Sequence, residues 1–520
     1  MKKTKLRLGI DVGGTNTDGV LMSGSEVLGA HKSFTTDDIS GGVISTVSEL
    51  LQGSGVPAGN IGSVMIGTTQ FVNAFLQRRH LSEVAVVRIC LPKSDGVPPM
   101  VAWPDDLRAI IGSHIYLVGG GSFYTGLEYA SLDEDELDKV GLDIAKKGLN
   151  AIVITANFAP VRPDIEERAA SILRRHLPNA DITLSAQVGG MGLIDRENAA
   201  IINAALSQLS RKVVTSLVSA FQNVGINAPI YISQNDGTLI STGYAQRFPI
   251  FTCSAGPTNS IRGAAFLTGL QEAVVVDVGG TTTDVGFLLR GFPRETATAN
   301  TIGGVRTNFR MPDVLSIALG GGTVVRQSAT GVTLGPDSVG YQLKDKGMIF
   351  GGDTLTTTDI AVRAGQFSLG DRSKVAGLPD ALVSSVLDII HARIEVAIDQ
   401  MKTNSRPVPV VLVGGGAILV SRPLKGASQV YQPEYAEVAN AIGAAIALVS
   451  GRVDRLFDVG ALGREGALAQ AKGEAIAAAV AAGADPDSVQ IVDVVELPMT
   501  HMKSGSVQIK VRAVGELADE

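Results

Sequence analysis

The segment LGIDVGGTNTDGV, residues 8–20, contains a pentad that the chain repeats letter for letter. The pentad Asp-Val-Gly-Gly-Thr occupies residues 11–15 and returns at residues 277–281, within AVVVDVGGTTTDVGF, residues 273–287. In both copies an apolar run precedes the aspartate, and a Thr-Asp pair and further apolar residues follow. A repeated acidic, glycine-rich turn indicates two related halves that face one ligand. We expect that ligand to be a nucleotide phosphate with its divalent metal.

Each copy is expected to form two strands joined by a glycine turn. Residues 7–12 are rich in branched apolar side chains, which favours a strand, and residues 19–22 resemble a second one. Gly13 and Gly14 allow a tight turn and leave backbone N–H groups uncovered, and consecutive uncovered amides form an anion site. Asp11 ends the first strand. A carboxylate there can hold Mg2+ directly or through water, since Mg2+ prefers oxygen ligands and keeps much of its water.

Two other phosphate-binding motifs do not fit the sequence. A P-loop requires Gly-x-x-x-x-Gly-Lys-Ser/Thr at the start of a helix, and a dinucleotide fingerprint requires Gly-x-Gly-x-x-Gly there. A strand–turn–strand hairpin with Asp-x-Gly-Gly-Thr resembles instead the phosphate loop of the actin-like ATPases. One Asp-x-Gly-Gly is also an ordinary turn, but two identical copies with matching flanks favour the phosphate loop.

The predicted nucleotide site combines the two pentads with a third glycine segment. Asp11 and Asp277 are expected to order Mg2+ through its waters and to act as the catalytic carboxylates. An apolar run at residues 408–413 ends in a glycine triplet, the usual place and composition for the adenosine-side loop in actin-like ATPases. The predicted nucleotide-binding residues are Gly13, Gly14, Thr15, Gly279, Gly280, Thr281, Gly414, Gly415 and Gly416.

Length and composition exclude several classes of protein. A chain of 520 residues is too long for one simple core, so two or three domains are expected. The formal net charge of −7 argues against a nucleic-acid partner, whose binding surface would be basic. Only Cys90 and Cys253 are present, which fits a reducing compartment. No uncharged apolar run reaches membrane-spanning length, so we expect no membrane association and a cytoplasmic location.

Strands and helices alternate along most of the chain, which predicts an α/β fold. Strands are expected at 61–67, 84–91, 151–156, 182–186 and 229–233, and helices at 41–51, 133–147, 163–175, 195–221, 382–401 and 435–449. An alanine-rich helix within 465–482 and strands at 488–496 and 507–514 suggest a small C-terminal α+β appendage. The expected domains are an N-terminal half at 1–252 with inserted segments, a second half at 253–452, and the appendage at 453–520.

Strings outside the pentads resemble the hydantoinase/oxoprolinase family over residues 6–450. They are Ile-Gly-Thr-Thr at 66–69, Arg-Glu-Asn at 196–198, Asn-Asp-Gly at 235–237, Ser-Ala-Gly-Pro at 254–257, Gly-Gly-Gly-Thr at 320–323, Gly-Pro-Asp-Ser-Val-Gly at 335–340, Phe-Gly-Gly at 350–352 and Thr-Thr-Thr-Asp at 356–359. The resemblance implies two actin-like ATPase, ribonuclease H-like domains around a nucleotide cleft, with ATP and Mg2+ as cofactors.

The resemblance also implies an activity. Members of the family use ATP to activate an amide or carbonyl oxygen, so the chain is expected to open a cyclic amide such as a hydantoin, 5-oxoproline or a related lactam or imide. It is also similar to the ATPase subunit of such an enzyme, which implies a second hydrolytic subunit as partner. Assembly of the chain into a homo-oligomer is a further possibility. The alternatives are a small-molecule kinase, the ATPase subunit of a ketone carboxylase-like complex, and a nucleotide-gated interaction protein.

Four polar residues are predicted on the substrate side, each with a structural alternative. Thr68 and Thr69 are either substrate contacts or ordinary strand-end hydroxyls. Asn235 and Asp236 are either substrate contacts or part of a turn before glycine. The aspartates that follow the pentads, Asp18 and Asp284, are expected to pair or cap locally. The histidines lack metal-ligand spacing, and burial is the default for both cysteines.

Overall fold

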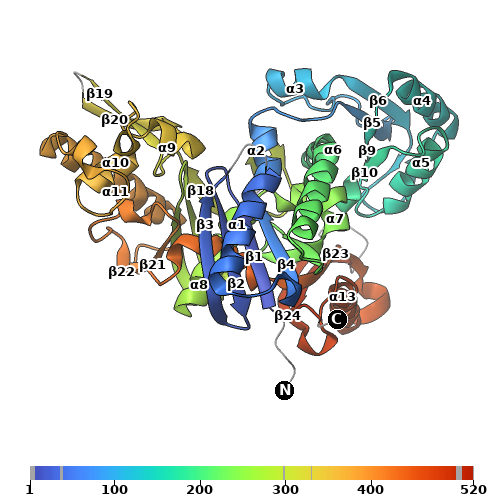
Figure 1. The fold of residues 1–520 in the computed structure, drawn as a ribbon. Helices are drawn as coiled ribbons and strands as arrows, with labels where there is room; N and C mark the ends of the chain where they lie inside the picture. The colour runs from blue at the N-terminus through green and yellow to red at the C-terminus, as the bar shows by residue number, and fades with distance from the viewer. Residues whose placement is uncertain (1–5, 36–38, 297–298, 329–330, 499–505, 519–520) are drawn as a thin grey trace.

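The computed structural model describes residues 6–35, 39–296, 299–328, 331–498 and 506–518. The first half occupies the centre of the molecule in Figure 1, the second half lies to the left, and an inserted module lies at the upper right. The C-terminal segment lies at the lower right, beside the first half. The arrangement makes the chain a mixed α/β protein, as the alternation of elements predicts.

The first half is built on a nine-stranded sheet with the order β24-β25-β23-β12-β11-β4-β1-β2-β3. β1 (Leu6–Val12), β2 (Asn16–Ser23) and β3 (Glu26–Phe34) form an antiparallel meander. β4 (Ile61–Thr68) runs parallel to β1, and β11 (Ile230–Ser233) runs parallel to β4. The predicted first hairpin is therefore confirmed, and its turn lies at the end of β1, next to the end of β4.

The second half repeats this order of strands and directions. β14 (Thr283–Leu289) is antiparallel to β13 (Glu272–Val278), and β15 (Phe292–Pro293) is antiparallel to β14. β21 (Val408–Val413) runs parallel to β13, and β22 (Ala427–Tyr431) runs parallel to β21. The series β15-β14-β13-β21-β22 thus corresponds to β3-β2-β1-β4-β11, so the repeated pentad marks a repeated architecture.

Two helices cross where the halves meet. α12 (Ala439–Ala445) packs on β1, β2 and β4, and α8 (Ala255–Thr268) packs on β13, β14 and β21. At the crossing, a side chain on Gly263 would place its Cβ 1.8 Å from the carbonyl oxygen of Ala439, and one on Gly443 would place its Cβ 1.9 Å from that of Asn259. Only glycine permits this approach of two backbones, so the crossing holds the two sheets together.

The inserted module is a four-stranded parallel sheet with the order β10-β9-β5-β6. Its elements are β5 (Val84–Leu91), β6 (His114–Gly119), β9 (Ala151–Ala156), β10 (Asp181–Leu184), α4 (Glu134–Lys147) and α5 (Pro163–His176). The long helix α6 (Leu193–Asn223) returns the chain to the first half. Arg88 of β5 and Glu197 of α6 form a fully buried ion pair that joins the module to this helix.

The C-terminal segment extends the first sheet. β23 (Leu448–Asp458) pairs with β12 (Thr238–Ser241), and β24 (Gln490–Pro498) and β25 (Ser506–Gly515) follow at the edge. α13 (Val459–Ala481) packs its buried alanines against these strands. The predicted alanine-rich helix and both predicted strands are confirmed, whereas the domain boundaries stay a prediction.

The predicted helix at 435–449 is wrong at both ends. Tyr435 has a left-handed backbone (φ 64°), α12 begins at Ala439, and the chain is already in β23 at Leu448. The run from 441 to 449 is apolar without a polar break, so its periodicity cannot separate helix from strand. Leu448 adopts the strand conformation because it pairs with Thr238 of β12.

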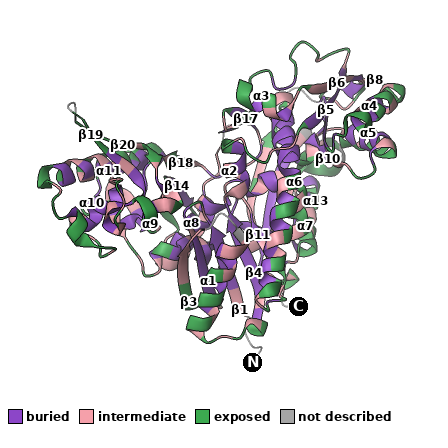
Figure 2. Ribbon diagram, turned by 45° about the horizontal axis from the view of Figure 1, so that its top comes forward, coloured by how far each residue is buried: buried purple, intermediate pink, exposed green. Residues whose placement is uncertain are grey.

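The apolar core lies along the sheets and the inner helices. Strands of the central sheet are mostly purple in Figure 2, and exposed residues gather on the outer helices and at the ends of loops. Among the described residues, no helix combines the length and apolar character needed to cross a membrane.

Candidate functional site

The two glycine turns meet. The hydroxyl oxygens of Thr15 and Thr281 are 3.3 Å apart, although the residues are separated by 266 positions. A Cβ on Gly280 would lie 2.7 Å from the Thr15 side chain. The structure therefore brings together the two segments that the repeated pentad singled out, tip to tip, at the junction of the halves.

Both turns have the same internal geometry. The N–H of Gly13 donates to the carbonyl of Asn16 (3.0 Å), and the N–H of Gly279 donates to that of Thr282 (2.9 Å). In the described part of the chain, the backbone N–H groups at 14, 15, 280 and 281 donate to no other residue. Such unused, neighbouring amides form a concave site for an anion.

Neighbouring loops hold the carbonyl side of each turn. The Thr35 hydroxyl donates to the carbonyl of Gly13 (2.9 Å). In the second half, Gly321 and Gly322 donate their N–H groups to the carbonyls of Gly279 (3.0 Å) and Gly280 (2.7 Å). Because these contacts occupy the carbonyls, the turns are fixed with their amides available.

Each pentad aspartate lies at a strand end and is held by one of the crossing helices. The Asn440 side chain of α12 donates to Asp11 Oδ2 (2.9 Å), and the Ser260 hydroxyl of α8 donates to Asp277 Oδ2. Asp11 is 3% exposed. The two carboxylates thus occupy equivalent positions, each with one neutral donor from a helix.

A glycine makes room for each carboxylate, one on the neighbouring strand β4 and the other directly after the neighbouring strand β21. A Cβ on Gly67 would lie 2.3 Å from Asp11 Oδ1, and a Cβ on Gly414 would lie 2.2 Å from Asp277 Oδ1. Gly67 stands directly beside Asp11 in the parallel pairing of β1 with β4. Any larger residue at either position would displace the carboxylate, so these two glycines have a defined steric role.

The carboxylates at the junction outnumber the nearby cations. Burial, together with the charges of Asp18 and Asp277, raises the pKa of Asp11 to about 7. Burial also raises the pKa of Asp277, and that of Asp284 to about 6. Lys32 of β3 opposes this effect on both Asp11 and Asp277. The site therefore has an excess of negative charge that a bound cation would relieve.

The aspartates that follow the pentads pair locally, as expected. Asp18 lies opposite Asp11 in the first hairpin and forms an ion pair with Lys32 (2.5 Å). Asp284 lies opposite Asp277 and accepts a hydrogen bond from the Ser316 hydroxyl. Both therefore contribute negative charge from the strand next to the one that carries the pentad aspartate.

The residues at the junction fit a hydrated Mg2+ ion. Asp11 Oδ1 and both polar atoms of the Asn259 side chain are buried and form no hydrogen bond with any described residue. Carboxylate and amide oxygens are the donors that Mg2+ prefers. Within the described ranges no three His, Cys, Asp or Glu side chains are grouped as metal ligands.

The predicted adenosine-side loop lies beside the second turn. The N–H of Gly416 donates to the carbonyl of Val278 (2.7 Å), and a Cβ on Gly416 would lie 2.9 Å from the carbonyl oxygen of Gly279. Gly414 has a positive φ of 83°, which favours glycine. The structure thus places residues 414–416 in contact with the second pentad.

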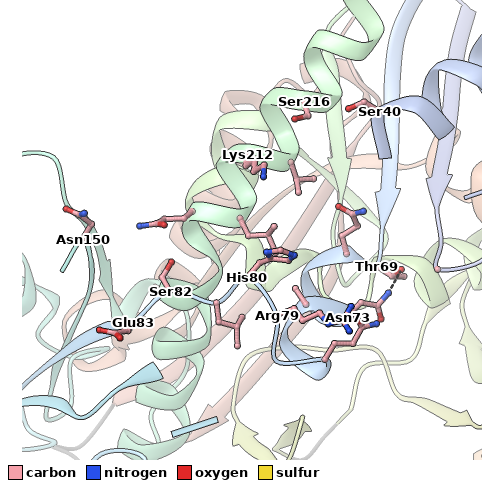
Figure 3. A pocket seen from close by; sticks show the side chains of 18 of the residues that line it. Ser40, Thr69, Asn73, Arg79, His80, Ser82, Glu83, Asn150, Lys212 and Ser216 are labelled. Carbon is pink, nitrogen blue, oxygen red and sulfur yellow. Dashed lines mark hydrogen bonds between the residues drawn. The ribbon is translucent and has the colours of Figure 1, made fainter. Parts of the chain in front are cut away.

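A cavity of about 910 Å³ opens at the first turn. Gly13, Gly14 and Thr69 line it together with Lys212 and Ser216 of α6. Figure 3 shows Thr69 and Asn73 on one side, with His80 and Lys212 projecting toward the middle. The Thr69 hydroxyl accepts a hydrogen bond from Asn73 (3.2 Å). None of the second pentad borders this cavity, so it adjoins one turn only.

The predicted substrate-side residues lie at or just after the ends of the neighbouring parallel strands β4 and β11, but Thr69 lines the first cavity and Asn235 and Asp236 line another. Thr68 is buried, and its hydroxyl accepts the N–H of Gln70 at the start of α2 (Gln70–Leu76). Asn235 uses both ends of its amide on backbone groups, those of Ile250 (3.1 Å) and Ser254 (2.7 Å). Asp236 forms a salt bridge with Arg452 in a separate cavity. Their substrate roles stay predictions.

Several residues at the junction were not predicted from the sequence. Asn440, Ser260 and Asn259 lie on the crossing helices, whose Gly-Ala-Ala triplets at 263–265 and 443–445 are a second short repeat. This repeat in the sequence could have indicated the two crossing helices. No sequence feature indicates Lys32, because only the register of β3 on β2 places it opposite Asp18.

Comparisons with known proteins agree with this architecture. The model of the hydantoinase/oxoprolinase N-terminal region matches residues 7–177, and that of hydantoinase/oxoprolinase matches residues 196–371. The caprolactamase subunit alpha of Pseudomonas jessenii is 23% identical over 417 residues, covering 76% of this chain and 59% of that protein. The acetophenone carboxylase gamma subunit of Aromatoleum aromaticum is 24% identical over 400 residues, covering 68% and 52%.

The chain spans about half the length of the curated relatives it matches. Among solved structures, the ATP-dependent caprolactamase from Pseudomonas jessenii superposes with a TM-score of 0.75 at 17% identity, covering 98% of this chain and 88% of that one. At that identity the likeness shows a shared fold.

Proposed function

The chain belongs to the hydantoinase/oxoprolinase family, and we propose that it is an ATP-dependent hydrolase that opens a cyclic amide, or the ATPase subunit of such an enzyme. The observation that carries the proposal is the contact between the two glycine turns through Thr15 and Thr281. A triphosphate needs donors on several sides, and two facing rows of unused amides supply them.

In the proposed site the two halves are actin-like ATPase domains around a nucleotide cleft. Residues 13–15 and 279–281 hold the phosphates from opposite sides, and residues 414–416 border the adenosine. Asp11 and Asp277 are the catalytic carboxylates. Bound Mg2+, ordered by these two carboxylates through its waters, would neutralise charge on the phosphates. Phosphate oxygens would replace the direct contact between the Thr15 and Thr281 hydroxyls.

The chemistry follows from the weakness of an amide as an electrophile. Transfer of the γ-phosphoryl group to the amide oxygen breaks the bond to ADP and forms an imidate phosphate. Water then adds to the carbon, the ring C–N bond breaks to leave an acyl phosphate, and a second water releases phosphate and the ring-opened acid. The protein contributes positioning and charge stabilisation of a loose transition state.

The cavity beside the first turn is the proposed entrance for the cyclic amide. Thr69 borders it, which supports the predicted substrate role for Thr69 more than for Asn235 and Asp236. A substrate in this cavity would meet the phosphates at Gly13 and Gly14, where the amide oxygen has to approach the γ-phosphorus.

Phosphate release tests the proposal. The purified chain is assayed with ATP and Mg2+ against lactams, hydantoins and cyclic imides, with and without a partner hydrolytic subunit. We expect one class to stimulate release and to yield a ring-opened acid. Asp277→Asn should abolish the stimulated release while leaving the fold intact. Turnover that no cyclic amide alters, under either condition, would favour a nucleotide-gated interaction protein.

A ketone carboxylase subunit is the second candidate. The acetophenone carboxylase gamma subunit matches this chain about as well as the caprolactamase subunit does. Such an enzyme would need bicarbonate for stimulated turnover and would form a carboxylated ketone. A small-molecule kinase would leave a lasting phosphorylated product, visible by phosphorus NMR. The three product analyses separate the functions on the same protein sample.

A further inference from the structure

A second cavity, of about 520 Å³, lies away from the glycine turns. Five segments distant in the sequence contribute to its walls. These are residues 186–191 at the approach to α6, residues 234–236 after β11, residues 308–310 of the second half, and the facing strands β23 and β25 at 452–456 and 508–511. The proposed function uses none of this cavity.

The wall of this cavity is rich in basic side chains. Arg310, Arg452, Arg455 and Lys510 face two carboxylates, Asp236 and Asp454. Arg455 also pairs with Glu474 of α13. The wall therefore carries more positive than negative charge, although the chain as a whole is acidic.

Two of the basic groups are weakly engaged. The closest carboxylate oxygens to Arg310 are 3.4 Å and 4.0 Å away, in Glu295 and Asp454. Lys510 lies 3.4 Å from Asp454. Close charge-assisted hydrogen bonds are about 2.7–2.9 Å, so both cations keep donors for a further partner. Each side chain is 26% exposed, which leaves it open to the cavity.

The strand register adds a strained arrangement of charge. Arg452 of β23 stands directly opposite Arg512 of β25. Like charges at opposed positions destabilise a sheet. Asp236 contacts both arginines, at 3.9 Å from Arg512, and Arg512 also pairs with Glu295 at 3.2 Å. Of the two arginines Arg452 lines the cavity, where a bound anion would offset part of this repulsion.

Aromatic side chains also line the cavity. Tyr244 and Phe251 both line it, and their rings are stacked with centroids 6.3 Å apart and an interplanar angle of 14°. Phe309 lines it as well. A ligand here would meet both flat apolar surface and cations.

We propose that this cavity binds a small organic anion, a carboxylate or a phosphate monoester with a flat or apolar body. Arg310 and Lys510 hold the anionic group, and Tyr244 and Phe251 pack on the body. The adjoining turn, residues 235–237, also packs on α8: the Thr258 hydroxyl donates to the carbonyl of Asn235 (2.8 Å). The wall of the cavity is therefore in contact with the helix that carries the partner of Asp277.

Calorimetry with simple probes tests the proposal without nucleotide. The full chain is titrated with benzoate and phenyl phosphate, and with benzamide as the neutral analogue. We expect the anions to bind and benzamide not to bind at millimolar concentration. Preference between benzoate and phenyl phosphate identifies the anionic group. Because no turnover is measured, the outcome is independent of the ATPase proposal.

Variants locate the bound probe. Arg310→Gln and Lys510→Gln should each weaken anion binding by about tenfold, the usual loss for one charge-assisted contact. Arg326→Gln is the matched control, since Arg326 is half exposed on β19 (Thr323–Ser328) and pairs with Asp337 outside the cavity. Equal binding of benzoate and benzamide, equal losses in all three variants, or no binding of any probe would overturn the proposal. Unchanged circular dichroism establishes that the variants fold.

Discussion

Replacement of Asp11 by asparagine should make the metal-free protein more stable while it removes Mg2+-dependent turnover. Asp11 is buried beside two other carboxylates, and its pKa rises from 3.8 to about 7. Ionised Asp11 is therefore disfavoured by the fold. Asparagine keeps the shape and can still accept the hydrogen bond from Asn440, but it has no charge to desolvate.

The magnitude and sign follow from linkage. When an acidic group has a higher pKa in the folded state than in the unfolded state, the protein loses stability as the pH rises between the two pKa values. One pKa unit corresponds to about 1.4 kcal/mol, so the shift of Asp11 to about 7 lowers the free energy of unfolding by about 4 kcal/mol between about pH 4 and pH 7. Asp11→Asn should lack this decline and exceed the parent at pH 8.

Denaturant unfolding from pH 5 to pH 8 in EDTA measures the effect. Trp103, the only tryptophan, is 5% exposed and packs against Phe75 in the core of the first half, so its fluorescence reports this region. Asp105→Asn, whose side chain is 96% exposed, is the control for a change of charge alone. Parallel pH profiles for Asp11→Asn and the parent would refute the electrostatic account.

Three further outcomes are expected, each from one local feature. Gly443→Ala should prevent folding, seen as lost soluble yield, because its Cβ would lie 1.9 Å from a carbonyl oxygen of α8, whereas Gly473→Ala in an open position of α13 should fold normally. Glu197→Gln leaves its arginine partner buried and unpaired, and should lower the free energy of unfolding by about 3–5 kcal/mol in urea titrations. Cys90 and Cys253 are buried, and burial raises the pKa of the Cys253 thiol to about 12, so a thiol reagent at pH 8 should modify neither until guanidinium is added.

The sequence predicted the parts of the fold that local patterns specify. The hairpins at both pentads, the inserted strands and the long helices follow from periodicity and glycine placement. The helix expected at 435–449 was misjudged because an unbroken apolar run carries no boundary, and a distant strand decided its end. Lys32, Ser260 and Asn440 reach the junction only through register and helix crossing, which no single segment encodes.

The way the carboxylates are supported also bears on how the junction could open. Asp11 receives its donor from Asn440, 429 residues away, yet both belong to the same packed unit because α12 rests on the first sheet. Asp277 and Ser260 form the corresponding unit on the second sheet. A rotation of the two sheets about the glycine crossing would therefore leave each carboxylate with its own partner. The same rotation would separate the hydroxyls of Thr15 and Thr281, and a phosphate would have to enter between them.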